Sequence, residues 1–167
     1  VNKIVLNVKS IMGYDIDFNT RLLIMLYSLI TFKNNNININ ALIIAHGYST
    51  ASSIGSIVNQ YFDEFIFDTI DIPIDISKEE ITRKVKEYLS SVDNEEETII
   101  LVDMKSLLYI ADDLKDVIKG DLIVINNITT NFAINIAKIM LEGKRIYKGI
   151  IDYIENNERS NYRFIKG

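Results

Sequence analysis

Residues 41–53 read ALIIAHGYSTASS, and this stretch decides the fold class. Its first part, Ala41–Ala45, is a short, continuous apolar run of the kind found in a β-strand that is covered on both faces. Its second part contains small and hydroxylated residues, which favour the start of a helix. Apolar residues then recur at helical spacing as far as Tyr61. The stretch therefore predicts a strand, a turn at Gly47 and a helix, which together begin a β–α alternation.

The same alternation recurs three more times along the chain. The further predicted strands are Phe65–Ile72, Thr98–Val102 and Leu122–Ile125, and the predicted helices cover residues 49–61, 77–89, 106–119 and 129–141, the last capped by Thr129 or Thr130. Ser77 followed by Glu80 forms a capping box. Four β–α units in succession favour the α/β class: a flavodoxin-like, doubly wound parallel sheet of four or five strands with helices on both faces.

The two ends of the chain are predicted to lie outside this alternation. Ile4–Met12 indicates a first helix, and Asn19 is the expected cap of a second. The Asn-rich segment Lys33–Asn40 is predicted to be a linker. Residues 146–154 favour a further helix, and Tyr162–Ile165 is either an edge strand or a frayed end. The expected organisation is an N-terminal helical segment with its linker over residues 1–38, an α/β domain over 39–142, and a C-terminal helix and tail over 143–167.

The composition argues against several functional classes. Eighteen basic and 23 acidic residues give a net charge of −5, which argues against a nucleic-acid-binding surface. The absence of cysteine excludes disulfides and thiolate sites, and a single histidine excludes metal sites that need two imidazoles. No apolar run approaches the ~20 residues of a membrane span, and no signal-peptide pattern opens the chain. We therefore expect a cytoplasmic domain without metal or cofactor that contacts neither nucleic acid nor membrane.

The only histidine ends the first predicted strand, and an aspartate follows the third. In a flavodoxin-like winding these two strands are neighbours where the winding reverses, and ligands bind at the carboxyl ends of such strands. His46 and Asp103 are therefore predicted to share one crevice. A neutral imidazole can attack through one nitrogen while a carboxylate accepts the N–H of the other, fixes the tautomer and stabilises the developing positive charge.

The residues that follow His46 suit a phosphoryl group. Gly47 allows the backbone to turn and to approach a ligand closely. The free N–H groups of a helix's first turn attract anions, and the hydroxyl groups of Ser49, Thr50 and Ser52 add hydrogen-bond donors. Together these features predict a phosphohistidine site. The plainer interpretation is structural, with a histidine in a turn and ordinary helix-capping residues around it.

Two stretches resemble the signature motifs of a known family. Leu42–Ser53 (LIIAHGYSTASS) and Ile99–Leu107 (IILVDMKSL) look like those of the mannose-family enzyme IIA domain of the sugar phosphotransferase system. The resemblance is closest to the form found in levanase-operon-type transcriptional regulators that work with sigma-54 polymerase, and it covers about residues 40–142. It implies a phosphoryl-accepting domain in which His46 receives phosphate from the phosphocarrier HPr and Asp103 orients the histidine.

The resemblance implies further properties, and the sequence departs from the family pattern in two respects. It implies a homodimer, and it places Ser106 near the serine of the second motif. It also implies that transport members of the family pass the phosphate to an enzyme IIB, whereas regulators use the phosphate to set their activity. Lys105 stands where the motif usually has glycine, and it is a candidate cation for the phosphate. The G-x-x-x-x-G-K-[ST] motif of an ATPase module is absent from this sequence.

Four other functions compete with the phosphohistidine hypothesis. A serine hydrolase would use Ser49 or Ser52 with His46 and Asp103, but the sequence has no G-x-S-x-G elbow. A response-regulator receiver would need a carboxylate cluster for Mg²⁺, for which Asp71, Asp75 and Asp103 are the candidates. Dinucleotide binding lacks its glycine fingerprint. The remaining alternative is an interaction or dimerisation module that keeps the fold without phosphate transfer.

Overall fold

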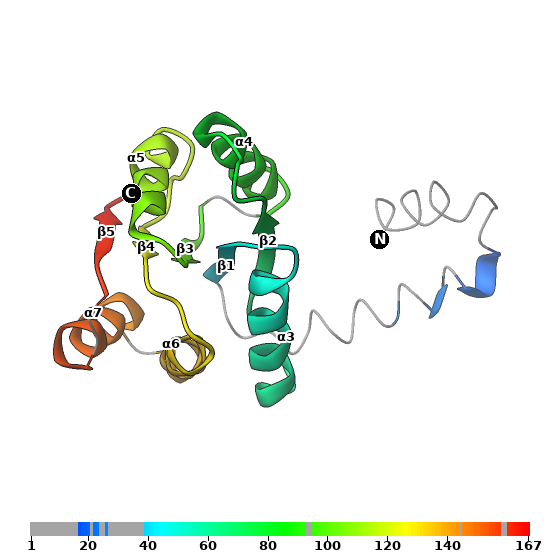
Figure 1. Cartoon of the computed structure of the whole chain (residues 1–167). Helices are drawn as coiled ribbons and strands as arrows, with labels where there is room; N and C mark the ends of the chain where they lie inside the picture. The colour runs from blue at the N-terminus through cyan, green and yellow to red at the C-terminus, as the bar shows by residue number, and fades with distance from the viewer. Residues whose placement is uncertain are drawn as a thin grey trace. The chain divides into compact units, whose positions relative to one another are not determined.

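The computed structural model describes residues 17–20, 22, 23, 26, 39–92, 95–143, 145–157 and 160–167. Contacts divide the chain into two units, Val1–Asn36 and Ile37–Gly167. The second unit is a three-layer α/β domain, in which the sheet lies between two layers of helices (Figure 1). The helix predicted over Ile4–Met12 and the linker residues 33–38 lie outside the described residues.

Five strands form the sheet in the order β2-β1-β3-β4-β5. The strands are β1 (Ile39–His46), β2 (Asp68–Ile72), β3 (Glu97–Val102), β4 (Leu122–Ile125) and β5 (Tyr162–Ile165). The first four are parallel, and β5 runs antiparallel to β4. The chain therefore winds from β1 to one edge and returns through β3 to the other, so the reversal lies between β1 and β3. The predicted flavodoxin-like winding is confirmed.

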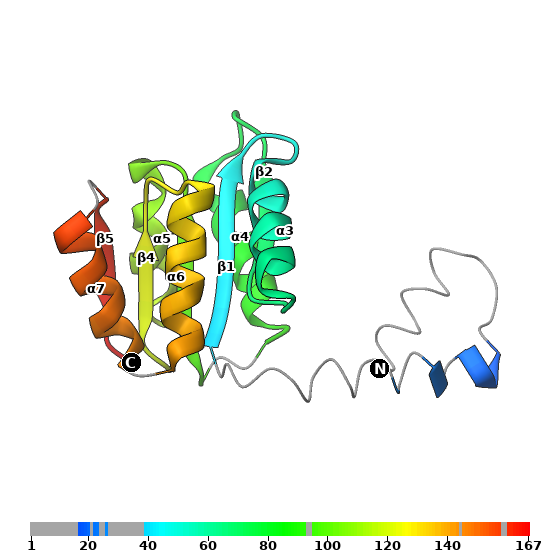
Figure 2. The ribbon, with the colours of Figure 1, turned by 90° about the horizontal axis from the view of Figure 1, so that it is seen from below.

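Helices cover both faces of the sheet (Figure 2). One face carries α3 (Thr50–Phe62), α6 (Thr130–Glu142) and α7 (Ile146–Asn157), and the other carries α4 (Lys78–Leu89), the 3₁₀ helix η1 (Lys105–Tyr109) and α5 (Ile110–Leu114). Alternate residues of β1 enter the two cores, with Ile43 and Ala45 in the first and Leu42 and Ile44 in the second. Because both faces are covered, the central part of β1, Ala41–Ala45, is a continuous apolar run.

Several predicted boundaries are confirmed by their caps. The Ser77 hydroxyl accepts the Glu80 N–H at 3.2 Å at the start of α4, and the Thr129 hydroxyl accepts the Phe132 N–H at 3.1 Å at the start of α6. Gly143 ends α6 in the left-handed conformation, with φ of 66°. These residues terminate helices for local reasons, because side-chain oxygens satisfy first-turn N–H groups and glycine tolerates positive φ.

The helix predicted over residues 106–119 is wrong. The chain forms the 3₁₀ helix η1 and then the single five-residue helix α5. The buried residues Leu107, Ala111, Leu114 and Ile118 recur at the three- and four-residue spacing of an α-helix, so the apolar pattern by itself does not indicate the 3₁₀ turn. The N–H groups of Val117 and Ile118 both bond back to the Leu114 carbonyl, which ends the helical segment early.

The strand predicted from Phe65 begins later, at Asp68. The side-chain oxygen of Asn59 accepts the N–H groups of Ile66 and Phe67 at 3.0 and 2.9 Å, and its amide nitrogen donates to the Phe67 carbonyl at 3.0 Å. One side chain therefore occupies the backbone groups that a longer strand would have used.

Two N-terminal predictions also need correction. Asp17 rather than Asn19 caps the helical residues 18–20, because its carboxylate accepts the N–H groups of Asn19 and Thr20 at 2.9 and 3.1 Å. The predicted linker overlaps the sheet, since Ile39 and Asn40 are the first residues of β1, where they pair with Glu97 and Thr98.

The last helix is tied to the sheet by a tyrosine hydroxyl. Tyr147 of α7 donates to the Asp121 carbonyl at 2.5 Å and accepts the Thr98 N–H at 3.0 Å. Burial raises the pKa of Tyr147, so the hydroxyl stays protonated and remains a donor. The contact joins α7 to the starts of β3 and β4, beside the antiparallel pairing of β5.

We expect Tyr147→Phe to lower the free energy of unfolding by about 1 kcal/mol, because the tie between α7 and the sheet is lost while the Thr98 N–H and the Asp121 carbonyl keep their own hydrogen bond of 2.8 Å. Urea denaturation followed by circular dichroism measures this change. Tyr61→Phe is the matched control, since that exposed hydroxyl has no hydrogen bond within the described residues. Equal stability of the two variants would contradict the prediction.

Candidate functional site

The structure brings the only histidine and one aspartate together at the reversal point of the sheet. His46 is the last residue of β1, and Asp103 follows β3 directly. The imidazole Nδ1 lies 3.1 Å from both carboxylate oxygens of Asp103. Asp103 Oδ2 also accepts the backbone N–H of His46 at 2.8 Å, and the Asp103 N–H donates to the Ile44 carbonyl at 3.3 Å. Ring and carboxylate are therefore held by main-chain as well as side-chain contacts.

This arrangement selects the reactive nitrogen of the ring. An ionised carboxylate only accepts hydrogen bonds, so Nδ1 carries the hydrogen and Nε2 keeps its lone pair. Within the described part of the chain, Nε2 makes no hydrogen bond. The side chains of His46 and Asp103 are 13% and 20% exposed. The site thus offers an oriented imidazole at the protein surface, which can act as a nucleophile or as a base.

The turn after His46 requires glycine. Gly47 has φ of 126°, and its N–H donates to the Ile72 carbonyl at 2.9 Å, which joins the turn to the end of β2. A Cβ atom at this position would lie 2.4 Å from the Thr50 hydroxyl oxygen. The backbone therefore passes close to the first turn of α3 only because residue 47 has no side chain.

A second carboxylate occupies part of the first turn of α3. Asp71 of β2 accepts the N–H groups of Ala51 and Ser52 at 2.7 and 3.3 Å. Two of the N–H groups that were expected to be free are therefore bonded, while those of Ser49 and Thr50 make no hydrogen bond in the described ranges. Sequence reasoning missed this role of Asp71, because the only signal is the register that pairs Asp71 with Ala45, next to His46.

The expected phosphate-binding residues have different surroundings. Gly47, Ser49 and Thr50 follow it directly. Ser52 lines a separate hollow of about 180 Å³ between α3 and β2, and Ser106 lines one of about 440 Å³ beside Arg163 of β5. Lys105 lines this second hollow as well. Within the described residues, no hydroxyl of Ser49, Ser52 or Ser106 bonds to His46 or Asp103, so Ser49 and Ser52 do not form the triad of a serine hydrolase.

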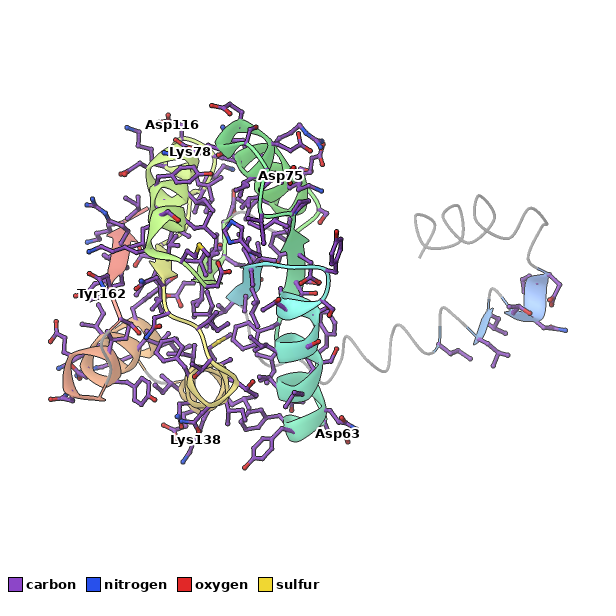
Figure 3. All side chains as sticks on the ribbon, in the orientation of Figure 1. Asp63, Asp75, Lys78, Asp116, Lys138 and Tyr162 are labelled. Carbon is purple, nitrogen blue, oxygen red and sulfur yellow. The ribbon has the colours of Figure 1, made fainter. Side chains whose placement is uncertain are left out.

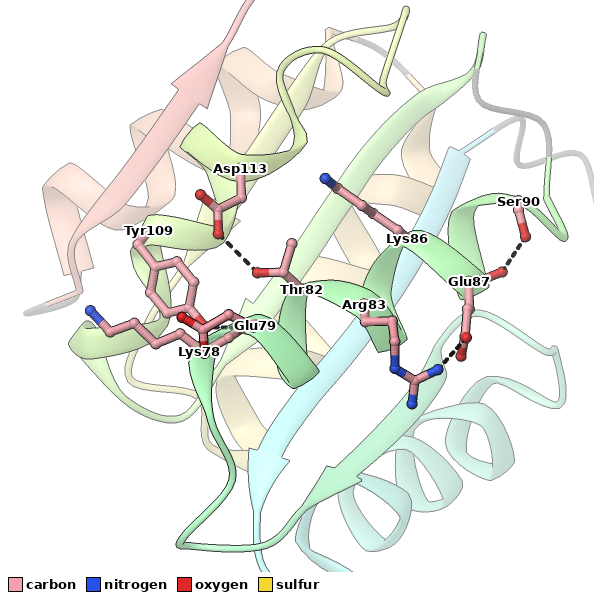
Figure 4. Close-up of a pocket in the computed structure, with 9 residues that line it drawn as sticks. All are labelled: Lys78, Glu79, Thr82, Arg83, Lys86, Glu87, Ser90, Tyr109 and Asp113. Atoms are coloured by element: carbon pink, nitrogen blue, oxygen red, sulfur yellow. Dashed lines mark hydrogen bonds and ion pairs between the residues drawn. The ribbon is translucent and has the colours of Figure 1, made fainter.

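A further hollow, which neither His46 nor Asp103 lines, lies between α4 and the η1–α5 segment (Figure 4). It has a volume of about 920 Å³. Several of the side chains at this hollow interact with one another. Arg83 forms ion pairs with Glu80 and Glu87, and the Thr82 hydroxyl donates to Asp113 at 2.8 Å. These five polar side chains are therefore paired with one another, and neither His46 nor Asp103 lines the hollow.

The fold and the pair of side chains define a class: a flavodoxin-like α/β domain with a carboxylate-oriented histidine at the switch point of its sheet. The chain belongs to the mannose-type enzyme IIA family, since the family model EIIA-man, described as the PTS system fructose IIA component, matches residues 40–132. This result confirms the family that the two motifs resemble.

Two relatives agree with this assignment. The chain is 28% identical over 143 residues to the transcriptional regulatory protein LevR of Bacillus subtilis (strain 168). That match covers 83% of this chain and only 15% of LevR. The crystal structure of a sigma-54 interaction domain protein from Enterococcus faecalis has the same fold, with a TM-score of 0.60 at 20% identity, over 72% of this chain and 93% of that one. Among the described helices, none combines the length and apolar character needed to cross a bilayer.

We expect Asp71→Ala to lower the free energy of unfolding by about 1 kcal/mol, because the first turn of α3 loses the acceptor of two N–H groups and a favourable charge at its positive end. Chemical denaturation measures the change. Asp75→Ala is the matched control, since Asp75 is an exposed carboxylate in the loop that follows β2 (Figure 3). A loss of the same size in both variants would contradict a capping role for Asp71.

Proposed function

We propose that this chain is a phosphoryl-accepting regulatory module of the sugar phosphotransferase type, phosphorylated on His46 by HPr or a related phosphocarrier. The observation that supports the proposal is the contact of His46 Nδ1 with the Asp103 carboxylate, which leaves Nε2 as the oriented nucleophile. The family match over residues 40–132 supports the same chemistry independently of the geometry.

The proposed phosphoryl transfer conserves atoms and electrons without any further reactant. The Nε2 lone pair of His46 attacks the phosphorus of the donor's phosphohistidine and forms a new P–N bond. The P–N bond of the donor breaks, and its electron pair returns to the donor's imidazole. The ring of His46 becomes formally positive, and Asp103 stabilises it by accepting the Nδ1 hydrogen bond.

The turn at Gly47 is the proposed place for the phosphate oxygens. It follows the histidine without an intervening residue, it lacks a Cβ, and the N–H groups of Tyr48, Ser49 and Thr50 make no hydrogen bond within the described residues. The Thr50 hydroxyl lies against the same turn. The positions of Ser52 and Ser106, which line other hollows, give less support for a direct contact.

The setting of the module is proposed from its relatives. The similarity to LevR favours control of a transcriptional regulator rather than transport of a sugar. The same proposal includes a homodimer, a cytoplasmic location and the division of the chain at residues 38 and 142. If the chain served transport instead, the phosphate would pass to an enzyme IIB. The alternative is an interaction or dimerisation module that keeps the fold without accepting phosphate.

Incubation with phosphoenolpyruvate, enzyme I and HPr should add one acid-labile, base-stable phosphate to each chain. His46→Ala should abolish the labelling, because the chain has no other histidine. Intact-protein mass spectrometry with and without acid treatment measures the phosphate. Labelling that persists in His46→Ala would place the site elsewhere, and a parent chain that takes up no phosphate would favour the interaction module.

Asp103→Asn should slow the transfer by about 10²-fold or more while leaving the fold intact. The Asn amide can donate to Nδ1, and this favours the tautomer with the hydrogen on Nε2, so the nucleophilic lone pair is lost. Rapid-quench measurement of phosphate uptake gives the rate. Asp75→Asn serves as the control, and a parental rate in Asp103→Asn would remove Asp103 from the mechanism.

A further inference from the structure

A hollow of about 440 Å³ lies between the η1–α5 segment and the start of β5. Helix α5 contacts β5, and the two elements lie side by side in Figure 1. Polar residues of both segments line the hollow: Lys105, Ser106 and Asp112 from the first, and Asn161, Tyr162 and Arg163 from the second. Its volume falls in the range of small-molecule sites, about 300–1,000 Å³.

Two cations at this hollow have no counter-ion among the described residues. The side chains of Lys105 and Arg163 are exposed, and neither forms an ion pair or a hydrogen bond within the described ranges. Arg83 and Lys119, in contrast, each pair with glutamate side chains. Like charges that line one hollow repel each other, and the chain as a whole has a net charge of −5. An anion bound between the two cations would remove this repulsion.

The hollow also offers hydrogen-bonding groups that the fold does not use. The Ser106 hydroxyl, the Asp112 carboxylate and the Asn161 side-chain amide make no hydrogen bond within the described part of the chain. The main chain of Asn161 is anchored, because its N–H donates to the Asn126 side-chain oxygen at 2.5 Å and its carbonyl accepts the Asn126 N–H at 3.0 Å. The backbone of Asn161 is therefore fixed at the hollow while its side-chain amide stays available.

The combination of charged and neutral groups indicates the class of ligand. Two cations and a hydroxyl donor suit a phosphate group, which accepts several charge-assisted hydrogen bonds. A carboxylate accepts hydrogen bonds from hydroxyl groups, and an amide both donates and accepts them. A neutral polyol would leave the two cations unpaired, and a molecule with an anionic group at each end would place one of them against Asp112. A phosphate that carries hydroxyl groups satisfies all of these side chains.

We propose that this hollow binds a small phosphorylated polyol. Lys105, Ser106 and Arg163 hold its phosphate group, and the side chains of Asp112 and Asn161 bind its hydroxyl groups. The site is separate from the histidine, since neither member of the histidine–carboxylate pair lines the hollow. The proposal is therefore independent of the phosphoryl transfer proposed above.

Isothermal titration calorimetry of the unphosphorylated chain tests the proposal with three probes: glucose 6-phosphate, sorbitol 6-phosphate and glycerol 3-phosphate. At least one probe should bind at one site per chain with a Kd in the millimolar range or below, which titration to about 10 mM detects. Glucose and inorganic phosphate should each bind at least about tenfold more weakly than that probe, because each supplies only part of the contacts. His46→Ala should keep the parental Kd.

The double variant Lys105→Ala/Arg163→Ala should raise Kd for the same probe at least about tenfold, because it removes both charge-assisted contacts to the phosphate. Both positions are exposed, so the fold should be kept, and circular dichroism checks this. The matched control, Lys138→Ala/Lys148→Ala, removes two positive charges from exposed positions of α6 and α7, on the opposite face of the sheet from η1 and α5 (Figure 3 labels Lys138). This control should keep the parental Kd.

Each other outcome overturns the proposal. A parent chain that binds none of the three probes has no such site, while the proposed function stands. Inorganic phosphate that binds as tightly as the organic probes removes the polyol from the assignment. Loss of binding in His46→Ala assigns the ligand to the histidine site, and an equal loss in the Lys138→Ala/Lys148→Ala control shows an effect of net charge alone.

Discussion

The Asp103 carboxylate is the contact on which the site depends. It accepts the backbone N–H of His46 and the Nδ1–H of the same residue, so it joins the end of β1 to the end of β3 and orients the ring at once. Its own N–H bonds to Ile44, which continues the pairing of the two strands beyond Val102. A ring fixed in this way is already oriented before any reactant binds, which lowers the entropic barrier to a reaction at Nε2.

Two carboxylates at the same edge of the sheet act on different groups. Asp103 faces the imidazole, whereas Asp71 bonds to the first turn of α3 and satisfies two of its N–H groups. The positive end of α3 is therefore already partly neutralised, while the N–H groups of Ser49 and Thr50 make no hydrogen bond within the described residues. None of the three hollows described above is lined by His46 or Asp103.

Local signals predicted much of the fold. The limits of β4 and β5 match the expected strands, and Ser77, Thr129 and Gly143 cap their helices as predicted, because each of these signals acts within a few residues. The predictions were wrong where a distant or different partner decided the conformation. Asn59 occupies the backbone of residues 66 and 67, and the segment after β3 divides into η1 and α5, which ends at Leu114.

The sequence by itself determined the α/β class, the winding, the family and the positions of His46 and Asp103 at strand ends, because apolar periodicity and short motifs are encoded in consecutive residues. Only the tertiary structure decided that the carboxylate binds both the ring and the main chain of His46, and that Asp71 rather than a ligand bonds to the first turn of α3. Those contacts depend on the register between strands that lie far apart in the chain. Strand register follows from the packing of both cores together, and no local pattern specifies it.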